Sequence, residues 1–87
     1  LSQGDVRFEA KTALVAAGGG LADLAHIIRE GRQALLPGGF MLLEHGWTQG
    51  KQVRDLFTDA GYLQAQTCKD YGGNDRLTLA SWPGARI

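Results

Sequence analysis

The chain has 87 residues, of which 44% are hydrophobic and 21% are charged, and this composition is typical of one small globular domain. Its nine basic and nine acidic residues cancel, which argues against binding nucleic acid or a membrane surface through bulk charge. The single cysteine, Cys68, excludes an intramolecular disulfide and fits a reducing compartment, and no apolar run approaches the ~20 residues of a membrane helix. We therefore expect a cytoplasmic protein.

Residues 1–20 show no sustained period, and we expect an irregular opening segment. Apolar and polar residues alternate around Arg7 and Glu9, so a short extended piece can lie within it, with these two side chains on one side. There they form either a solvated ion pair or the rim of a cleft. Residues 13–17 are consistent with either a helical turn or a buried loop.

The middle of the chain predicts a helix, a turn and a strand. Residues 21–36 carry apolar side chains on one helical face, and Pro37-Gly38-Gly39 ends that helix. Residues 40–45 begin with the uninterrupted apolar run Phe40-Met41-Leu42-Leu43, which indicates a strand buried on both faces. Glu44 lies at the C-terminal end of this strand, the end at which open α/β sheets bind ligands.

The last third of the chain predicts a second helix over residues 51–60, followed by strands over residues 63–69 and 76–82. Polar and glycine residues join these two strands, so we expect an antiparallel hairpin. Residues 76–82 are the more apolar, which places this last strand inside the sheet and residues 63–69 at its edge. Together the elements predict an α/β fold.

The local motifs identify no catalytic, cofactor-binding or metal-binding residue. The glycines at 18–20 lack the GxGxxG spacing, and residues 46–51 lack the spacing of a P-loop. His26 has no partner at metal-ligand spacing. Cys68 has no base near it in the sequence, and we interpret it as an inert thiol.

Several stretches of the sequence form a recognisable set. They are Asp5-Val6-Arg7-Phe8-Glu9 followed by Ala13-Leu14; Leu21-Ala22-Asp23 after three glycines; Leu36-Pro37-Gly38-Gly39 with Glu44 and Gly46; Ala60-Gly61-Tyr62; and Lys69-Asp70-Tyr71 with Gly73-Asn74-Asp75-Arg76. In this order they resemble the C-terminal part of the HemK-type release factor glutamine methyltransferases, which are class I S-adenosylmethionine-dependent methyltransferases. The last stretch is the most specific to the family. Ala10 departs from it, because the family usually has proline there.

The resemblance implies both a fold and an activity. Residues 1–87 would form a single partial domain, the C-terminal half of a Rossmann-like class I methyltransferase sheet, with a parallel strand, a helix and an antiparallel hairpin whose last strand is central. The parent enzyme would transfer a methyl group from S-adenosylmethionine to the side-chain amide nitrogen of glutamine. That glutamine lies in the Gly-Gly-Gln loop of peptide chain release factors, which are the implied protein partners.

The family's glycine-rich cofactor loop and its Asn-Pro-Pro-Tyr motif do not occur in this sequence. The resemblance therefore implies that the catalytic and cofactor-binding residues lie in an upstream half of the same catalytic domain. Because the chain opens on Leu1 rather than methionine, we expect a fragment that is inactive and binds no cofactor by itself. Arg7, Glu9 and Glu44 are then candidates for substrate-proximal residues.

Two alternatives stay open. The Pro-Gly-Gly strand fits a class I methyltransferase with a different substrate equally well, and the chain can also be a non-catalytic α/β interaction module. If the chain is a fragment, the strand over residues 40–45 lacks a neighbour at one edge. Either the opening segment folds back over that edge or the fragment self-associates.

Overall fold

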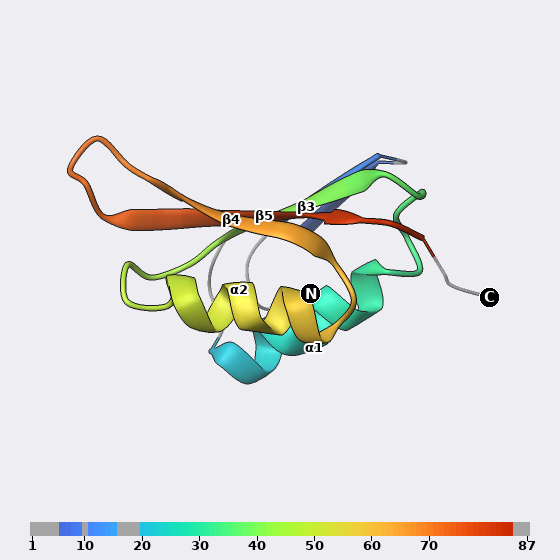
Figure 1. The fold of residues 1–87 in the computed structure, drawn as a ribbon, viewed down its shortest axis with the longest axis horizontal. Helices are drawn as coiled ribbons and strands as arrows, with labels where there is room; N and C mark the ends of the chain where they lie inside the picture. Colours follow the sequence, from blue (N-terminus) through green and yellow to red (C-terminus); the bar gives the residue numbers. More distant parts are fainter. Residues whose placement is uncertain (1–5, 10, 16–19, 85–87) are drawn as a thin grey trace.

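The structure is a computed structural model that describes residues 6–9, 11–15 and 20–84. The described part forms five strands and two helices: β1 (Val6–Glu9), β2 (Thr12–Val15), α1 (Leu21–Gly31), β3 (Gly39–Glu44), α2 (Gly50–Asp59), β4 (Leu63–Lys69) and β5 (Asp75–Trp82). These strands belong to one sheet in the order β1-β2-β3-β5-β4 (Figure 1).

The strand pairing agrees with the topology expected for the C-terminal half of a Rossmann-like sheet. β5 lies between β3 and β4 and pairs antiparallel with both, so the last strand is central and β4 forms the edge. On its other side, β3 pairs in parallel with β2. The predicted fold class and the central position of the last strand are therefore confirmed.

The sequence predicts an irregular opening segment, but the residues of it that the structure describes, 6–9 and 11–15, contain two paired strands. β1 and β2 form an antiparallel hairpin in which Val6 lies opposite Val15 and Glu9 lies opposite Thr12. β2 also lies beside β3, with Thr12 opposite Phe40. Tertiary pairing explains the difference, because β2 takes up the open edge of β3 and so replaces the helical turn or buried loop expected there. Of the two open alternatives, the opening segment folds back over this edge.

Helix α1 is shorter than the predicted helix over residues 21–36. It ends at Gly31, and the chain continues as a tight turn in which the N–H groups of Gln33 and Ala34 donate to carbonyl groups three residues earlier, at 3.1 and 3.0 Å. Leu35 is still buried, which explains why the apolar pattern extends beyond the helix. The second helix and the last three strands lie within one residue of their predicted bounds.

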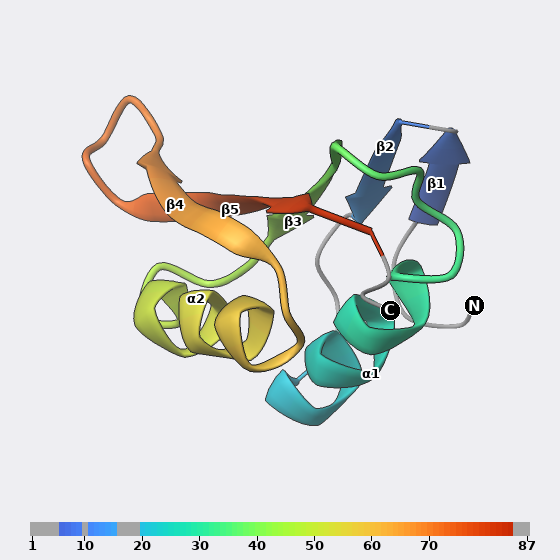
Figure 2. The same cartoon turned by 45° about the vertical axis from the view of Figure 1, so that its right-hand side comes forward.

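The two helices of the described part cover the same face of the sheet (Figures 1 and 2). α2 lies beneath β4 and β5, and α1 packs beside α2. Gly31 lets α1 approach β3, because a Cβ at this position would collide with the Cε of Met41. The core between the layers consists of Ala13, Val15, Leu24, Ile27, Ile28, Leu35, Met41, Leu43, Val53, Phe57, Ala60, Tyr62 and Ala80.

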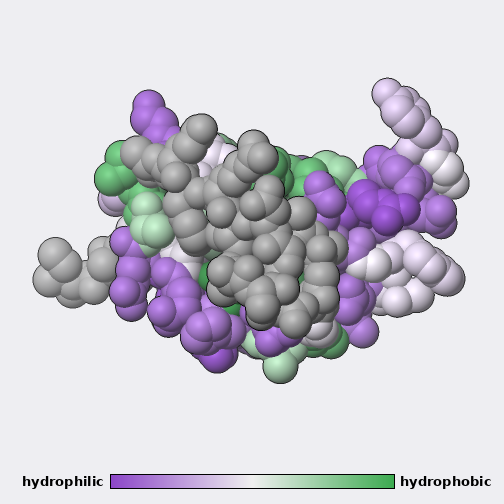
Figure 3. Space-filling model, turned by 180° about the vertical axis from the view of Figure 1, so that it is seen from behind, coloured by the Kyte–Doolittle hydropathy of each residue, from purple (hydrophilic) through white to green (hydrophobic). Residues whose placement is uncertain are grey.

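The opposite face of the sheet carries apolar side chains that no described element covers. Along β3, Met41 is buried beneath the helices, whereas Phe40 is 44% exposed and Leu42 is half-buried. The predicted burial of this strand on both faces is therefore wrong for the described part of the chain. Leu42 lies opposite Leu14 on β2 and Leu79 on β5, so an apolar row crosses the strands. Figure 3 shows hydrophobic surface along its upper margin, on the side away from the helices.

Candidate functional site

The carboxyl end of β3 carries two polar residues in opposite surroundings. Glu44 is exposed on the uncovered face of the sheet, and His45 is buried on the helix side with 2% of its surface exposed. The alternation of a strand explains this, because adjacent side chains point to opposite faces. The loop that follows presents Trp47, which is 65% exposed, before α2 begins at Gly50.

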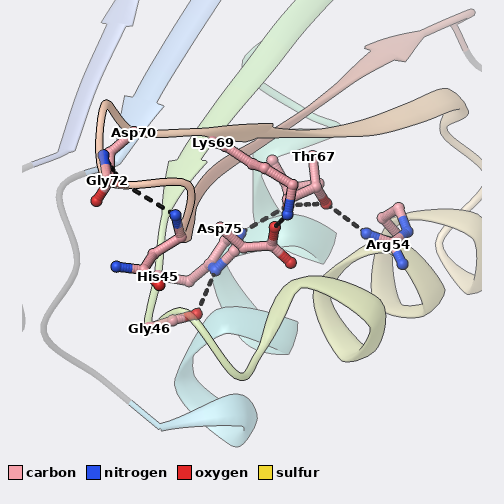
Figure 4. Close-up of polar contacts among 10 residues, drawn as sticks. His45, Gly46, Arg54, Thr67, Lys69, Asp70, Gly72 and Asp75 are labelled. Carbon is pink, nitrogen blue, oxygen red and sulfur yellow. Dashed lines mark hydrogen bonds and ion pairs between the residues drawn. The ribbon is translucent and has the colours of Figure 1, made fainter.

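A line of hydrogen bonds connects His45 to α2 through the hairpin strands (Figure 4). Its Nε2 lies 2.7 Å from Oγ1 of Thr78 on β5. That oxygen lies 2.8 Å from Oγ1 of Thr67 on β4, to which Nη1 of Arg54 on α2 donates at 2.6 Å. On the other side of the ring, Nδ1 lies 2.8 Å from the carbonyl oxygen of Gly46. The side chains of His45, Thr78, Thr67 and Arg54 thus form a polar path, which is buried at His45 and Thr78 and half-buried at Thr67 and Arg54.

The loop after β3 is closed by two hydrogen bonds between Gly46 and Gln49. The N–H of Gly46 donates to Oε1 of Gln49 at 2.8 Å, and the N–H of Gln49 donates to the carbonyl of Gly46 at 3.0 Å. The N–H of His45 donates at 3.0 Å to the carbonyl of Arg76, which anchors the loop to β5. These backbone donors are used within the protein, so they do not form an open cradle for an anion.

The turn between β4 and β5 lies at the same edge of the sheet and is built around Asp70. Its Oδ1 accepts from the N–H groups of Asn74 at 3.1 Å and Gly72 at 2.9 Å, and its Oδ2 accepts from Nη2 of Arg76 at 3.1 Å. These bonds, the one from Asn74 foremost, hold the pKa of Asp70 below its usual value. Gly73 adopts a φ of +84°, a conformation that favours glycine. The turn predicted from composition is confirmed.

Asp75 brings the hairpin close to the start of α2. Its Oδ1 accepts from Nζ of Lys69 at 2.7 Å, and this bond lowers the pKa of Asp75. Its Oδ2 lies 2.7 Å from the position that a Cβ on Gly50 would occupy. The glycine therefore allows a close approach between the first turn of α2 and this carboxylate.

The three predicted substrate-proximal residues do not meet in one place. Glu44 ends β3 at its carboxyl end. Glu9 lies opposite Thr12, which lies opposite Phe40 near the amino end of β3, so Glu9 belongs to the other end of the sheet. Arg7 takes an intermediate position in the register. This separation follows from the β1–β2 hairpin, which the sequence pattern does not reveal.

The remaining features of the described structure are weaker candidates for a functional site. A hollow of about 150 Å³ between α1 and α2 is lined in part by Arg29, Arg32 and Asp59. It is smaller than the ~300–1,000 Å³ of most ligand pockets. Within residues 6–9, 11–15 and 20–84, no group of three or more His, Cys, Asp or Glu side chains is placed to hold a metal ion. No helix of this described part is long and apolar enough to cross a membrane.

Sequence patterns do not reveal this polar path. His45 draws attention by its place at a strand end, but Arg54, Thr67 and Thr78 belong to three other elements. One signal does exist in the sequence. Thr78 interrupts an apolar run at a position that strand alternation turns inward, and a buried hydroxyl needs a hydrogen-bond partner.

Comparison with known proteins finds relatives that match nearly the whole chain. No protein-family model matches the sequence. Over 82 residues, or 94% of its length, the chain is 60% identical to the release factor glutamine methyltransferase of Escherichia coli K12. The resemblance to the release factor glutamine methyltransferases is confirmed. The chain is also 62% identical over 78 residues to the Salmonella typhimurium enzyme and 51% identical over 86 residues to that of Vibrio cholerae.

The release factor glutamine methyltransferases are much longer than this chain. The chain spans 30% of the length of the E. coli and V. cholerae proteins and 28% of the S. typhimurium protein, although the matches cover 90–99% of the chain itself. The similarity therefore concerns a part of those proteins. A sheet with its last strand central is the structure that the resemblance implies for this part.

Proposed function

We propose that this chain is the C-terminal part of a cytoplasmic release factor glutamine methyltransferase. The parent enzyme transfers a methyl group from S-adenosylmethionine to the side-chain amide nitrogen of the glutamine in the Gly-Gly-Gln loop of peptide chain release factors. The observation that carries this proposal is the 60% identity over 94% of the chain to a relative of that name. The β3-β5-β4 order supports it, because the resemblance implies that arrangement.

The reaction sets a specific demand on the protein. An amide nitrogen is a poor nucleophile because its lone pair is delocalised into the carbonyl group. Catalysis must hold the nitrogen in line with the methyl group and polarise the amide with fixed hydrogen bonds. We propose that this chain helps to position the protein substrate at the carboxyl end of β3.

We propose that Glu44 is the residue with which this chain helps to position the substrate. It is exposed at the strand end, where its carboxylate can accept hydrogen bonds from N–H groups of a bound peptide loop. Arg7 and Glu9 remain proposed substrate-proximal residues. The strand register, which separates Glu9 from Glu44, makes Glu44 the first of the three to test.

We assign S-adenosylmethionine binding to the rest of the enzyme. The loop of this chain that follows a buried strand, residues 46–49, uses the N–H groups of Gly46 and Gln49 for its own hydrogen bonds. These two N–H groups are therefore not available to hold a cofactor in the way that the donors of a glycine-rich loop are. By this proposal the chain alone neither binds the cofactor nor transfers a methyl group.

The uncovered sheet face supports the proposal that an upstream half of the same catalytic domain packs on this chain. Phe40 and Leu14 on this face are 44% and 38% exposed. α/β proteins of this kind carry helices on both faces of the sheet. More than two thirds of the E. coli relative lies outside the matched part, which is enough chain to supply such helices.

A chimera tests the proposed function. In it this chain replaces the matched 30% of the E. coli relative, and mass spectrometry locates methyl groups on a release factor incubated with the chimera and S-adenosylmethionine. We expect one methyl group on the glutamine of the Gly-Gly-Gln loop and none on a release factor in which alanine replaces that glutamine. A chimera that folds and binds S-adenosylmethionine but leaves the release factor unmethylated refutes the proposal.

A further inference from the structure

The groups at the two ends of the polar path determine which atom donates in each of its hydrogen bonds. The carbonyl oxygen of Gly46 can only accept, so Nδ1 of His45 carries a hydrogen and donates to it. The guanidinium group of Arg54 can only donate, so Oγ1 of Thr67 accepts from it. The hydrogen positions at both ends therefore follow without any assumption about the hydrogen bonds of Thr78.

These ends also determine the hydrogen bonds in between. A neutral imidazole with its hydrogen on Nδ1 has a lone pair on Nε2, so the hydroxyl of Thr78 donates to that nitrogen at 2.7 Å. Thr78 has then used its only hydrogen, and the hydroxyl of Thr67 donates to it at 2.8 Å. The imidazole hydrogen and both hydroxyl hydrogens of the path thus each meet an acceptor. A doubly protonated imidazole would donate to Thr78 as well, and one of the two threonine hydroxyls would then have no acceptor in the path for its hydrogen.

We propose that His45 is a positioning residue which, as its neutral Nδ1–H tautomer, holds the loop of residues 46–49 in the shape in which it meets the protein substrate. This inference rests on the proposed function. The carbonyl of Gly46 accepts from Nδ1 of His45 at 2.8 Å and from the N–H of Gln49 at 3.0 Å, so the first peptide of the loop is fixed from inside the protein. Trp47 is the next residue along.

The surface presented in this way suits a peptide loop with free N–H groups. The indole of Trp47 is 65% exposed and offers a flat apolar face on which a glycine-rich backbone can lie. The exposed carboxylate of Glu44 offers an acceptor for N–H groups. His45 itself is buried and touches neither the outer surface nor the substrate. It acts through Gly46, which makes it a positioning residue rather than a catalytic one.

Thr78 is the residue to change, because its hydroxyl can be removed with little change of volume. Thr78→Val deletes the donor to Nε2 of His45 and keeps a side chain of the same size in a fully buried position. Thr78→Ser keeps the hydroxyl and serves as the rescue variant. Thr58→Val is the matched control, because the Thr58 hydroxyl bonds to the backbone carbonyl of Arg54 at the exposed surface of α2, outside the path.

Nitrogen NMR of the histidine rings tests the tautomer directly. The chain has two histidines, and His26 is exposed, so selective ¹⁵N labelling gives two ring spectra that a His26→Gln variant assigns. At neutral pH we expect Nδ1 of His45 protonated and Nε2 unprotonated in the wild type, Thr78→Ser and Thr58→Val. Thr78→Val should keep the same tautomer, which the carbonyl of Gly46 selects, but should shift the Nε2 resonance because the hydroxyl that donates to this nitrogen is gone. A wild-type His45 that carries its hydrogen on Nε2 overturns the assignment.

Kinetics of the chimera test the positioning role. Losing one buried hydrogen bond corresponds to about a tenfold change in an equilibrium constant, so Thr78→Val should raise the KM for the release factor about tenfold and Thr78→Ser by at most about twofold. The KM for S-adenosylmethionine should not change, because the loop faces the protein substrate. A folded Thr78→Val chimera with an unchanged KM for the release factor, or with an equal rise for the cofactor, overturns the proposal. If the unsubstituted chimera transfers no methyl group, the proposed function fails, and the ring spectra still confirm or overturn the tautomer.

Discussion

Replacing Tyr62 by phenylalanine should lower the free energy of unfolding by about 1–2 kcal/mol, since a buried carbonyl left without its donor costs about 1–3 kcal/mol. Tyr62 is 3% exposed, and its hydroxyl donates at 2.8 Å to the carbonyl of Ile28. That carbonyl lies in the last turn of α1, where helical N–H donors run out. The N–H of Arg32, four residues on, donates instead to the carbonyl of Arg29 at 3.3 Å.

The magnitude follows from what the substitution leaves in place. The Tyr62 ring lies edge-on to Phe57 with the ring centroids 5.0 Å apart, and 5.2 Å from the ring of Trp82. Phenylalanine keeps these contacts and removes only the hydroxyl. The oxygen no longer has to be buried, which offsets part of the lost hydrogen bond. In a domain of this size, about 1 kcal/mol lowers Tm by roughly 4–8 °C.

The same residue makes stability depend on alkaline pH. Burial raises the pKa of Tyr62 from 10.0 to about 12, against a smaller opposing effect of Arg32. The folded state therefore favours the neutral phenol. Its contribution to stability is complete below the unfolded pKa of 10.0 and is lost as the pH rises through about 12. Tyr62→Phe should remove this alkaline loss.

Urea unfolding followed by circular dichroism, at neutral pH and near pH 11, measures both effects. Tyr71→Phe is the matched control, because Tyr71 is fully exposed in the β4–β5 turn and its substitution should change stability by less than about 0.5 kcal/mol. The reasoning is refuted if Tyr62→Phe unfolds at the same urea concentration as the wild type. It is also refuted if the variant loses stability at alkaline pH as steeply as the wild type does.

Three further predictions concern the carboxyl edge of β3. Glu44→Gln in the chimera should raise the KM for the release factor about tenfold, the effect of one charged hydrogen bond, and an unchanged KM contradicts its substrate-proximal role. Asp70 has a lowered pKa in the folded state, so the stability it contributes is present above its unfolded pKa of 3.8 and is lost as the pH falls through the lower folded value. Urea titrations across acid pH should show this slope in the wild type and a weaker slope in Asp70→Asn. Gly50→Ala should cost about 1–3 kcal/mol in urea unfolding, because its Cβ meets Oδ2 of Asp75. Lys51→Ala, on the exposed side of the same turn, should cost less than about 0.5 kcal/mol, and equal losses in the two variants contradict the close-approach argument.

The sequence predicts best those elements that are bounded by turn-forming residues. Gly38 and Gly61 adopt φ values of +85° and +95° and mark the turns that precede β3 and β4. The hydrophobic periods between such points identify α2, β3 and the hairpin within one residue. β2 has no such signal, because its strand form depends on pairing with β3, and pairing is decided by the tertiary structure.

The candidate site is only partly predictable for a similar reason. The strand period places Glu44 and His45 on opposite faces at the carboxyl end of β3, and the structure agrees. The hydrogen bond between His45 and Thr78 joins residues 33 positions apart, and no local spacing encodes it. The sequence therefore predicts where polar groups emerge from the sheet, whereas their partners depend on which strand becomes the neighbour.

The wrong prediction for β3 helps to choose among the alternatives that the sequence leaves open. In a complete interaction module with helices on one face, the outward positions of β3 would be polar. Phe40 and Leu42 occupy those positions, and Leu14 and Leu79 extend the apolar row across both neighbouring strands. β2 satisfies the backbone edge of β3, but it leaves this face uncovered in the described part of the chain. A strand whose sequence is that of a doubly buried strand, in a structure that covers one of its faces, supports the proposal that another part of a larger protein packs on this face.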